Sequence, residues 1–386
     1  MFFRKQNDFD KFRCIADKCP MNCCSGWQIV IDDKSLEKYN AYSGEFQKRL
    51  HSGIDFSESC FKQNNGRCSM LAESGLCDLQ SNLGEEYLCD TCRLYPRHTE
   101  EFLDLREYSL SLSCPEVVRM LVESKQHLSF EESEDDSEDD IDDYDDFDLF
   151  LFDKLTYARE QMLKVVRRDD ISLQRKMDII ASAAFTLQGC YDEGEFSPMD
   201  DVTYEDALSV GDNPRHGYNL FSNESTASNN NFSAKDNRQN MLDLSNQFTI
   251  DYSFNYMCDS LDLLLSLEEL YPSWHDILEE TKTYWNKKGP NSSEWNQTMN
   301  PKPAKSFIFE KMLESLLFTY FCGSIYDGEI YARAMIAVMT VRWIMMISAA
   351  DTGLTFEETV YLFSREVEHS DLNLNALIKW FEAELE

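Results

Sequence analysis

The sequence predicts a mainly α-helical protein of the α+β class, in which a loop-rich cysteine module with short strands packs on a larger helical domain. Two observations lead to this prediction. Ten of the 13 cysteines lie between Cys14 and Cys114, and much of that region reads as loops. Beyond residue 150, apolar residues recur mainly at helical spacing. With 386 residues, 42% of them hydrophobic, the chain is long enough to bury a large core in two or more domains.

We expect three parts: a cysteine-rich metal module at 1–130, an acidic linker at 131–150 and a helical domain at 151–386. The linker prediction rests on a run in which 13 of the 18 residues from Glu131 to Asp148 are acidic, because such runs repel themselves and rarely fold. The alternative is that this run attracts a basic substrate. Within the helical domain, a flexible insertion is expected near 211–240, where Asn, Ser, Asp and Gly dominate.

In the cysteine module, residues 1–13 read as a short lead-in. A β-branched, alternating pattern predicts a strand at 26–32, and helical spacing predicts a helix at 33–50. Residues 102–113 alternate and read as a strand or hairpin arm. Pro115, directly after Cys114, is typical of the first turn of a helix.

The helical domain shows apolar stripes of period 3.6. Arg333 and Arg342 interrupt the most apolar stripe, which therefore predicts a buried core helix rather than a membrane span. Thr355 and Glu358 form a capping box ahead of another apolar run. A loop is expected at 287–303, and the stripes predict helices at 155–166, 173–187, 261–270, 307–321, 330–350 and 372–385.

The net charge of −35 argues against nucleic-acid or anionic-membrane binding, because phosphate contacts need a basic face. An acidic protein attracts basic partners instead. The first residues contain no apolar core of a secretory signal, so we expect a cytoplasmic protein.

The crowded cysteines favour a metal site over disulfides. Thiols stay reduced in the cytoplasm, the total count is odd, and adjacent Cys23 and Cys24 suit disulfide geometry poorly. Structural zinc sites usually show two close ligand pairs, whereas only Cys89-x-x-Cys92 has that spacing here. Thiolates spread over several loops favour an iron–sulfur cluster, and zinc remains the alternative.

Familiar catalytic motifs are missing from the sequence. It contains no Gly-x-Gly-x-x-Gly loop, no serine nucleophile elbow and no His-Glu-x-x-His helix. Positive groups do follow the Cys89–Cys92 pair, at Arg93, Arg97 and His98. These three are the catalytic candidates: they either hold a carboxylate or phosphate, or only neutralise a thiolate cluster. We expect Trp27 to pack over the metal, and Cys190, Cys258 and Cys322 to be core residues.

Several ordered motifs resemble the flagellin lysine-N-methylase family. The resemblance is carried by Cys14 with Cys19-x-x-x-Cys23-Cys24-x-Gly26-Trp27, by Cys68-x-x-Leu71 and Gly75-Leu76-Cys77, by the run from Leu83 to His98, and by the run from Ser109 to Glu116. The segment from Tyr320 to Gly328 also resembles that family's C-terminal half.

This resemblance implies methyl transfer from S-adenosylmethionine to lysine ε-amines of flagellin, assisted by a [4Fe-4S] cluster. It implies no residue for S-adenosylmethionine binding, and Cys60 falls outside the pattern. The alternative function is a non-catalytic iron- or zinc-delivery module with a helical partner-binding domain. The cysteines that match the family, and are therefore expected to bind metal, are Cys14, Cys19, Cys23, Cys24, Cys68, Cys77, Cys89, Cys92 and Cys114.

Overall fold

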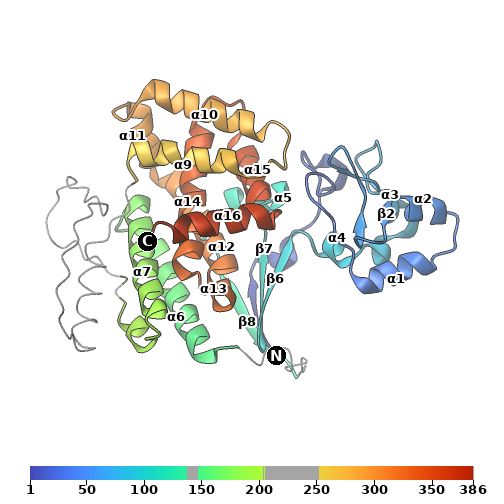
Figure 1. The fold of residues 1–386 in the computed structure, drawn as a ribbon, viewed down its shortest axis with the longest axis horizontal. Helices are drawn as coiled ribbons and strands as arrows, with labels where there is room; N and C mark the ends of the chain where they lie inside the picture. Colours follow the sequence, from blue (N-terminus) through green and yellow to red (C-terminus); the bar gives the residue numbers. More distant parts are fainter. Residues whose placement is uncertain (137–146, 203, 205–251, 386) are drawn as a thin grey trace. The chain divides into compact units, whose positions relative to one another are not determined.

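The computed structural model, drawn as a ribbon in Figure 1, describes residues 1–136, 147–202, 204 and 252–385. It divides into two compact units. The first unit comprises Met1–Asp139, Leu265–Thr281 and Ala350–Asn375. The second comprises Asp140–Leu264, Lys282–Ala349 and Ala376–Glu386. Helices dominate and the strands are short, so the predicted mainly α class is confirmed. The insertion expected near 211–240, and residues 137–146 of the acidic tract, lie outside the described residues.

The first unit contains a four-stranded sheet with the order β6-β7-β1-β8 (Figure 1). Strands β6 (Arg97–Phe102) and β7 (Leu105–Leu110) form an antiparallel hairpin, which confirms the strand or hairpin arm expected at 102–113. β1 (Phe2–Gln6) pairs in parallel with β7, and β8 (Phe130–Glu134) pairs antiparallel with β1.

The lead-in expected at residues 1–13 is wrong, because β1 is an inner strand of this sheet. The partner of β1 lies about a hundred residues away in the sequence, so no local pattern revealed the pairing. The acidic tract also begins as a strand, since β8 includes its first residues. Charge explains this: Arg4 of β1 lies 3.5 Å from Glu132 and 3.8 Å from Glu107, on the two neighbouring strands.

The cysteine-rich part of the first unit is built from short elements around a small apolar core. The predicted strand at 26–32 is wrong, because only Val30 in that range makes a bridge, to Cys60. The helix expected at 33–50 is broken at Tyr42, whose backbone is extended. The elements are α1 (Asp33–Ala41), α2 (Gln47–Ser52), β2 (Ile54–Asp55), β3 (Cys60–Phe61), β4 (Gln63–Asn64), β5 (Arg67–Cys68), α3 (Asp78–Leu83) and α4 (Asp90–Leu94). Their core includes Ile29, Ile31, Tyr39, Leu50 and Phe61.

Two helices complete the part of the first unit that matters for the site. α5 (Pro115–Glu123) starts at the predicted proline. α15 (Phe356–Glu368) starts at the predicted capping box, in which Thr355 and Glu358 each bond the other's backbone N–H, and it contacts α5.

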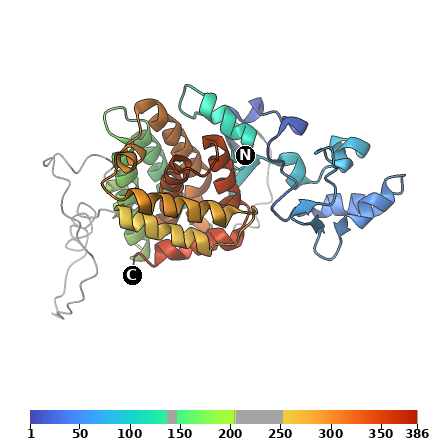
Figure 2. The ribbon, with the colours of Figure 1, turned by 90° about the horizontal axis from the view of Figure 1, so that it is seen from above.

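The second unit is helical, with α14 (Ile330–Ala349) as its core helix. α14 contacts α7, α11 and α12, and α6 lies beside α7 (Figures 1 and 2). By length and composition α14 qualifies as a membrane span, but 94% of its most apolar window is buried inside the protein, which confirms the predicted core helix. Among the described residues, the remaining α-helices are α6 (Leu149–Val166), α7 (Leu173–Asp192), α9 (Phe254–Ser266), α10 (Trp274–Lys288), α11 (Ser293–Met299), α12 (Pro303–Tyr320), α13 (Ser324–Asp327) and α16 (Asp371–Glu382).

The loop expected at 287–303 contains α11, so that prediction is wrong in part. Ser292 caps this helix by accepting a hydrogen bond from the backbone N–H of Trp295 at 3.2 Å. The Trp295 ring is buried against Trp285 and Phe254. Burial of this one aromatic side chain stabilises a helix that is too short to form by itself.

Candidate functional site

Seven of the nine family cysteines line one cavity of about 370 Å³ in the first unit. The other two, Cys68 and Cys89, are buried and do not line it, with 5% and 0% of their surface exposed. Phe12, Leu76 and Leu88 add apolar walls. The seven lining cysteines are Cys14, Cys19, Cys23, Cys24, Cys77, Cys92 and Cys114.

The cysteines sit where loops meet the first turns of helices. Cys77, Cys89 and Cys114 are the N-cap residues of α3, α4 and α5. Burial raises the pKa of the Cys77 and Cys114 thiols, and backbone N–H groups of the helix that each one precedes oppose this. Burial thus disfavours the thiolate, which is the form that binds metals. The backbone N–H groups favour the thiolate and oppose this effect of burial.

Two pairs of neighbouring thiols shift each other's pKa. The thiol of Cys24 lowers the pKa of Cys23 to about 7, and Cys23 raises the pKa of Cys24. The thiol of Cys92 likewise lowers the pKa of Cys89, and Cys89 raises the pKa of Cys92. Each pair thus has one thiol that loses its proton readily.

Cys68 and Cys77 interact with these pairs electrostatically. We call Cys23, Cys24, Cys68, Cys77, Cys89 and Cys92 the six-thiol group.

The donor chemistry of the six-thiol group fits an iron–sulfur cluster, which needs four soft thiolates. All of its thiols are free. Across the described ranges of the chain, no three Cys, His, Asp or Glu side chains already form a group that could hold a metal ion. The thiols therefore gather as interacting pairs beside a cavity, and they do not form a closed ligand set.

The three catalytic candidates differ in position. Arg93 and Arg97 line the cavity. Arg93 is 48% exposed and bonds Asp90 at 2.5 Å, while Arg97 lies over the rings of Phe9 and Phe12. His98 does not line the cavity. Its Nε2 lies 2.6 Å from Glu100 on the same strand. The structure thus brings two of the three candidates to the thiols.

Arg365 of α15 is the residue beside the thiols that sequence reasoning missed. Its guanidinium is buried and donates to three backbone carbonyls: Ser113 at 2.9 Å, Asn22 at 3.1 Å and Met21 at 3.1 Å. Its charge lowers the pKa of nearby Cys19, Cys23 and Cys114, although burial raises the pKa of Cys19 and Cys114 on balance. One signal was visible in the sequence: an arginine among the apolar residues of a helical stripe.

His369, which follows α15, was also missed. Its ring stacks on Trp27 with ring centres 4.5 Å apart. Its Nε2 lies 3.0 Å from the hydroxyl of Ser113, which also lies 3.2 Å from the Tyr95 hydroxyl. Burial lowers the pKa of His369 to about 3, so the imidazole is neutral near pH 7.

Trp27 itself holds a thiol loop in place, because its Nε1 donates to the Cys23 carbonyl at 2.8 Å. Left-handed Gly26 (φ +88°) sets the turn between them.

The remaining cysteines are core residues, as expected for three of them. Cys190, Cys258 and Cys322 are 1–5% exposed in the second unit. Cys60, which falls outside the family pattern, is buried in β3 and is not among the residues lining the cavity.

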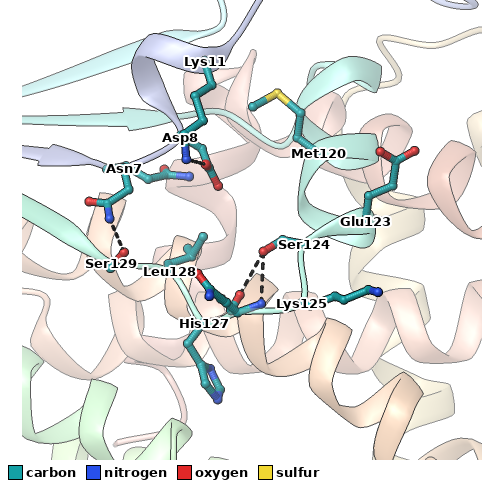
Figure 3. Close-up of a pocket in the computed structure, with 12 residues that line it drawn as sticks. Asn7, Asp8, Lys11, Met120, Glu123, Ser124, Lys125, His127, Leu128 and Ser129 are labelled. Atoms are coloured by element: carbon teal, nitrogen blue, oxygen red, sulfur yellow. Dashed lines mark hydrogen bonds and ion pairs between the residues drawn. The ribbon is translucent and has the colours of Figure 1, made fainter.

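A second cavity of the first unit, of about 430 Å³, is polar (Figure 3). Its side chains largely bond one another: Asn7 donates to Ser129 at 2.5 Å, and Lys11 to Asp8 at 2.8 Å. His127 points away from Asp8 and Lys11. We therefore place the candidate site at the cysteine cavity.

Comparison with known proteins decides the family. The model of the FliB lysine N-methylase C-terminal domain matches residues 159–386, more than half of the chain. The chain belongs to the FliB lysine N-methylase family. The matched residues contain the segment from Tyr320 to Gly328, whose resemblance to the family is weaker than that of the cysteine motifs before residue 120. No solved protein structure matched this FliB-family chain.

Curated relatives agree with the family. A lysine-N-methylase of Salmonella typhimurium is 28% identical over 131 residues, which are 32% of this chain and 33% of the relative. A lysine-N-methylase of Salmonella choleraesuis is 28% identical over 130 residues, 31% of this chain and 32% of that protein. The flagellar biosynthetic protein FliU of Salmonella muenchen is 28% identical over 135 residues, 32% of this chain and 78% of FliU. The FliB-family chain thus aligns with only about a third of each lysine-N-methylase.

Proposed function

We propose that this protein transfers methyl groups from S-adenosylmethionine to lysine ε-amines of flagellin, in the cytoplasm, with a [4Fe-4S] cluster bound by the six-thiol group. Membership of the FliB lysine N-methylase family is the observation that carries the proposal. The names of the relatives, lysine-N-methylase and flagellar biosynthetic protein, support lysine as the target and a flagellar protein as the substrate.

Four thiolates of the six-thiol group would hold the cluster. When bound, the cluster supplies iron that is open to redox chemistry, and it ties the loops of the cysteine-rich part together. Cys23 and Cys89 are the thiols of the two neighbouring pairs whose pKa is lowered, so they are the first to present thiolate to iron.

Methyl transfer needs a neutral lysine. The amine lone pair forms the new N–C bond, the S–C bond of the sulfonium breaks, and its electrons stay on sulfur. A protonated amine has no lone pair, so its proton must leave first. Positive charge from Arg93 and Arg97 at the cavity lowers the pKa of an amine that enters it, and the apolar walls disfavour its charged form.

Mass spectrometry of flagellin tests the activity. Flagellin expressed with this protein should carry methylated lysines, each methyl adding about 14 Da, and flagellin expressed alone should not. Equal methylation in both samples would contradict the proposal.

Calorimetry with S-adenosylmethionine separates the enzyme from the alternative, a metal-delivery module. The enzyme should release or absorb heat on binding this cofactor, whereas a delivery module should give none.

The metal has its own test. Protein purified without oxygen should be brown and contain iron and acid-labile sulfide in similar amounts. A colourless protein with stoichiometric zinc would contradict the iron–sulfur assignment.

A further inference from the structure

A row of hydrogen-bonded hydroxyl groups leads from the cysteine cavity to a carboxylate. Tyr95 lines the cavity, and its hydroxyl lies 3.2 Å from the Oγ of Ser113. The Ser113 Oγ lies 2.5 Å from the Oγ of Ser111, which donates to Oε2 of Glu368 at 2.5 Å. All four residues belong to the first unit, as does the cavity. We call Tyr95, Ser113 and Ser111 the hydroxyl chain.

The direction of the hydroxyl chain follows from its protons, because each hydroxyl has only one to donate. An ionised carboxylate only accepts, so Ser111 donates to Glu368. Ser113 must then donate to Ser111, whose own proton is already used. The Ser113 oxygen accepts from Tyr95 and, at 3.0 Å, from Nε2–H of the neutral His369. Every proton of the chain therefore points from the cavity towards Glu368.

Burial along the hydroxyl chain suits the movement of a proton. Ser113 is fully buried, so bulk water does not take the place of its hydroxyl. Glu368 is only half-buried, so its carboxylate can exchange protons with solvent. The Tyr95 ring is fixed between Trp27, at 5.9 Å, and His369, at 5.8 Å between ring centres. The chain thus connects the cavity, through a dry step, to a carboxylate that water reaches.

The proposed function requires such a connection, because an incoming lysine ε-ammonium must lose a proton before its nitrogen can attack. Arg93 and Arg97 at the cavity bring positive charge and accept no proton. Among the described residues that line the cavity, the one carboxylate is Glu85, which is exposed. Glu85 is therefore the competing acceptor that an experiment has to exclude.

We propose that the hydroxyl chain carries the lysine proton from the cavity to Glu368. The ammonium N–H bond breaks as its proton goes to the Tyr95 oxygen, while Tyr95, Ser113 and Ser111 each pass their own proton one step along. One proton ends on the Glu368 carboxylate, which releases it to water, and the amine nitrogen keeps the electron pair. The proposal rests on the proposed function for the lysine and the methyl transfer.

The other charged and titratable groups on α15, and on the segments packed around its end, have hydrogen-bond partners of their own. They are Arg365 and Glu366 on α15, Glu116, Arg119 and Glu123 on α5, and Glu268 and His369 beside them. All of these groups are unchanged in the variants below. A difference in pH dependence between a variant and the wild type therefore comes from the hydroxyl chain and Glu368.

Initial rates of methyl transfer to flagellin, measured at neutral pH and at high pH, test the proposal. Ser111→Val removes the last hydroxyl of the chain, and Glu368→Gln removes the final acceptor while keeping its shape. Each should lower kcat at neutral pH at least about tenfold, with the KM for flagellin unchanged, because the bound lysine stays protonated. At about pH 9.5 far more of the lysine is already neutral, so the loss should become severalfold smaller.

Two further variants serve as matched controls. Ser111→Thr has nearly the shape of Ser111→Val but keeps a hydroxyl, so it should restore most of the lost rate. Glu85→Gln removes the competing carboxylate and should keep the wild-type kcat at both pH values. Iron content should equal that of the wild type in all four variants, because none of them changes a thiol.

The outcomes separate the hydroxyl chain from the proposed function. An active wild type together with unchanged kcat in folded Ser111→Val and Glu368→Gln would overturn the chain alone. A loss of equal size at both pH values, or one accompanied by loss of iron, would show that these side chains only hold the cysteine loops, and would also overturn it. A pH-dependent loss in Glu85→Gln would assign the proton to Glu85 instead. Absence of methylation by the wild type would overturn the proposed function itself.

Discussion

At the residue scale, Cys89 and Cys92 are the thiols for which the sequence and the structure support the same test. Cys92 lies three residues after Cys89, one turn into α4, and the two thiols shift each other's pKa. Cys89→Ser and Cys92→Ser each replace a soft thiolate with a hard hydroxyl, so iron content and thermal stability should fall.

Cys258→Ser is the control, because Cys258 is a buried core residue of the second unit. It should cost at most about 1–3 kcal/mol and keep the iron. Iron retained in both variants of the pair, or lost in the control, would overturn the ligand assignment.

Arg365 offers a second residue-scale prediction. Arg365→Met leaves the carbonyls of Met21, Asn22 and Ser113 without their donor. Unfolding free energy should fall by about 2–4 kcal/mol, because buried acceptors lose charged hydrogen bonds. Hydrogen exchange should rise in the thiol loop around residues 19–24. Arg93→Met, at a half-exposed site, should change neither quantity measurably.

Glu366 predicts a pH dependence of stability. Its buried carboxylate accepts from the N–H groups of Leu270 at 2.9 Å and Tyr271 at 2.6 Å. Burial raises its pKa to about 7, and the nearby charges of Glu269 and Glu268 add to this rise. The folded state therefore holds the proton more tightly than the unfolded state. Its contribution to stability is complete below the ordinary carboxyl pKa and is lost as pH rises through about 7.

Glu366→Gln removes this titration. The loss of melting temperature between about pH 5 and about pH 8 should therefore be smaller in the variant than in the wild type. An equal loss in both proteins would show that other groups cause the pH dependence.

At the element scale, helix α15 supports the site, because Arg365 lies in its last turn and His369 follows it. Its capping box is open to a direct test. Thr355→Ala removes the side chain that accepts from the Glu358 N–H and should cost about 1 kcal/mol of unfolding free energy. Thr355→Ser keeps the hydroxyl and should cost much less. Equal losses in the two variants would mean that the cap contributes nothing.

Elements with local signals were predictable from the sequence, and those that depend on distant partners were not. Thr355 and Glu358 stand three residues apart, and Pro115 marks its helix by itself, so both helix starts were found. β1 is an inner strand because it pairs with β7 on one side and with β8 on the other. Acidic residues of β8 join the sheet because Glu132 forms an ion pair with Arg4 of β1. No window of a few residues contains that information.

The same distinction between local signals and distant contacts explains which residues of the candidate site were predicted from the sequence. The cysteines were recognisable because a crowded set of thiols is rare in any sequence, and seven of them do line one cavity. Arg365 and Asn22 are 343 positions apart, so their contact was not accessible. Arg342 looked like an interruption of an apolar stripe. Only the structure shows that its guanidinium is buried between the Asp178 carboxylate and the Tyr252 ring.

At the scale of the whole molecule, the two units should differ in their dependence on metal. The second unit has its own apolar core around α14, whereas the first holds all ten clustered cysteines in short elements. Calorimetry of the full chain should show two unfolding transitions. Anaerobic removal of iron should lower the temperature of one transition and leave the other within about a degree. A uniform shift of both would contradict this division.

The first unit is assembled from three separate stretches of the chain, and this has a consequence for protein synthesis. A ribosome makes all ten clustered cysteines before it makes Arg365, which lies 251 residues after Cys114, and His369. Until then the loop around Met21 and Asn22 lacks the guanidinium that holds its carbonyls. Metal loading should therefore be largely post-translational, and nascent chains should depend on the reducing milieu, or on a chaperone, to protect their thiols.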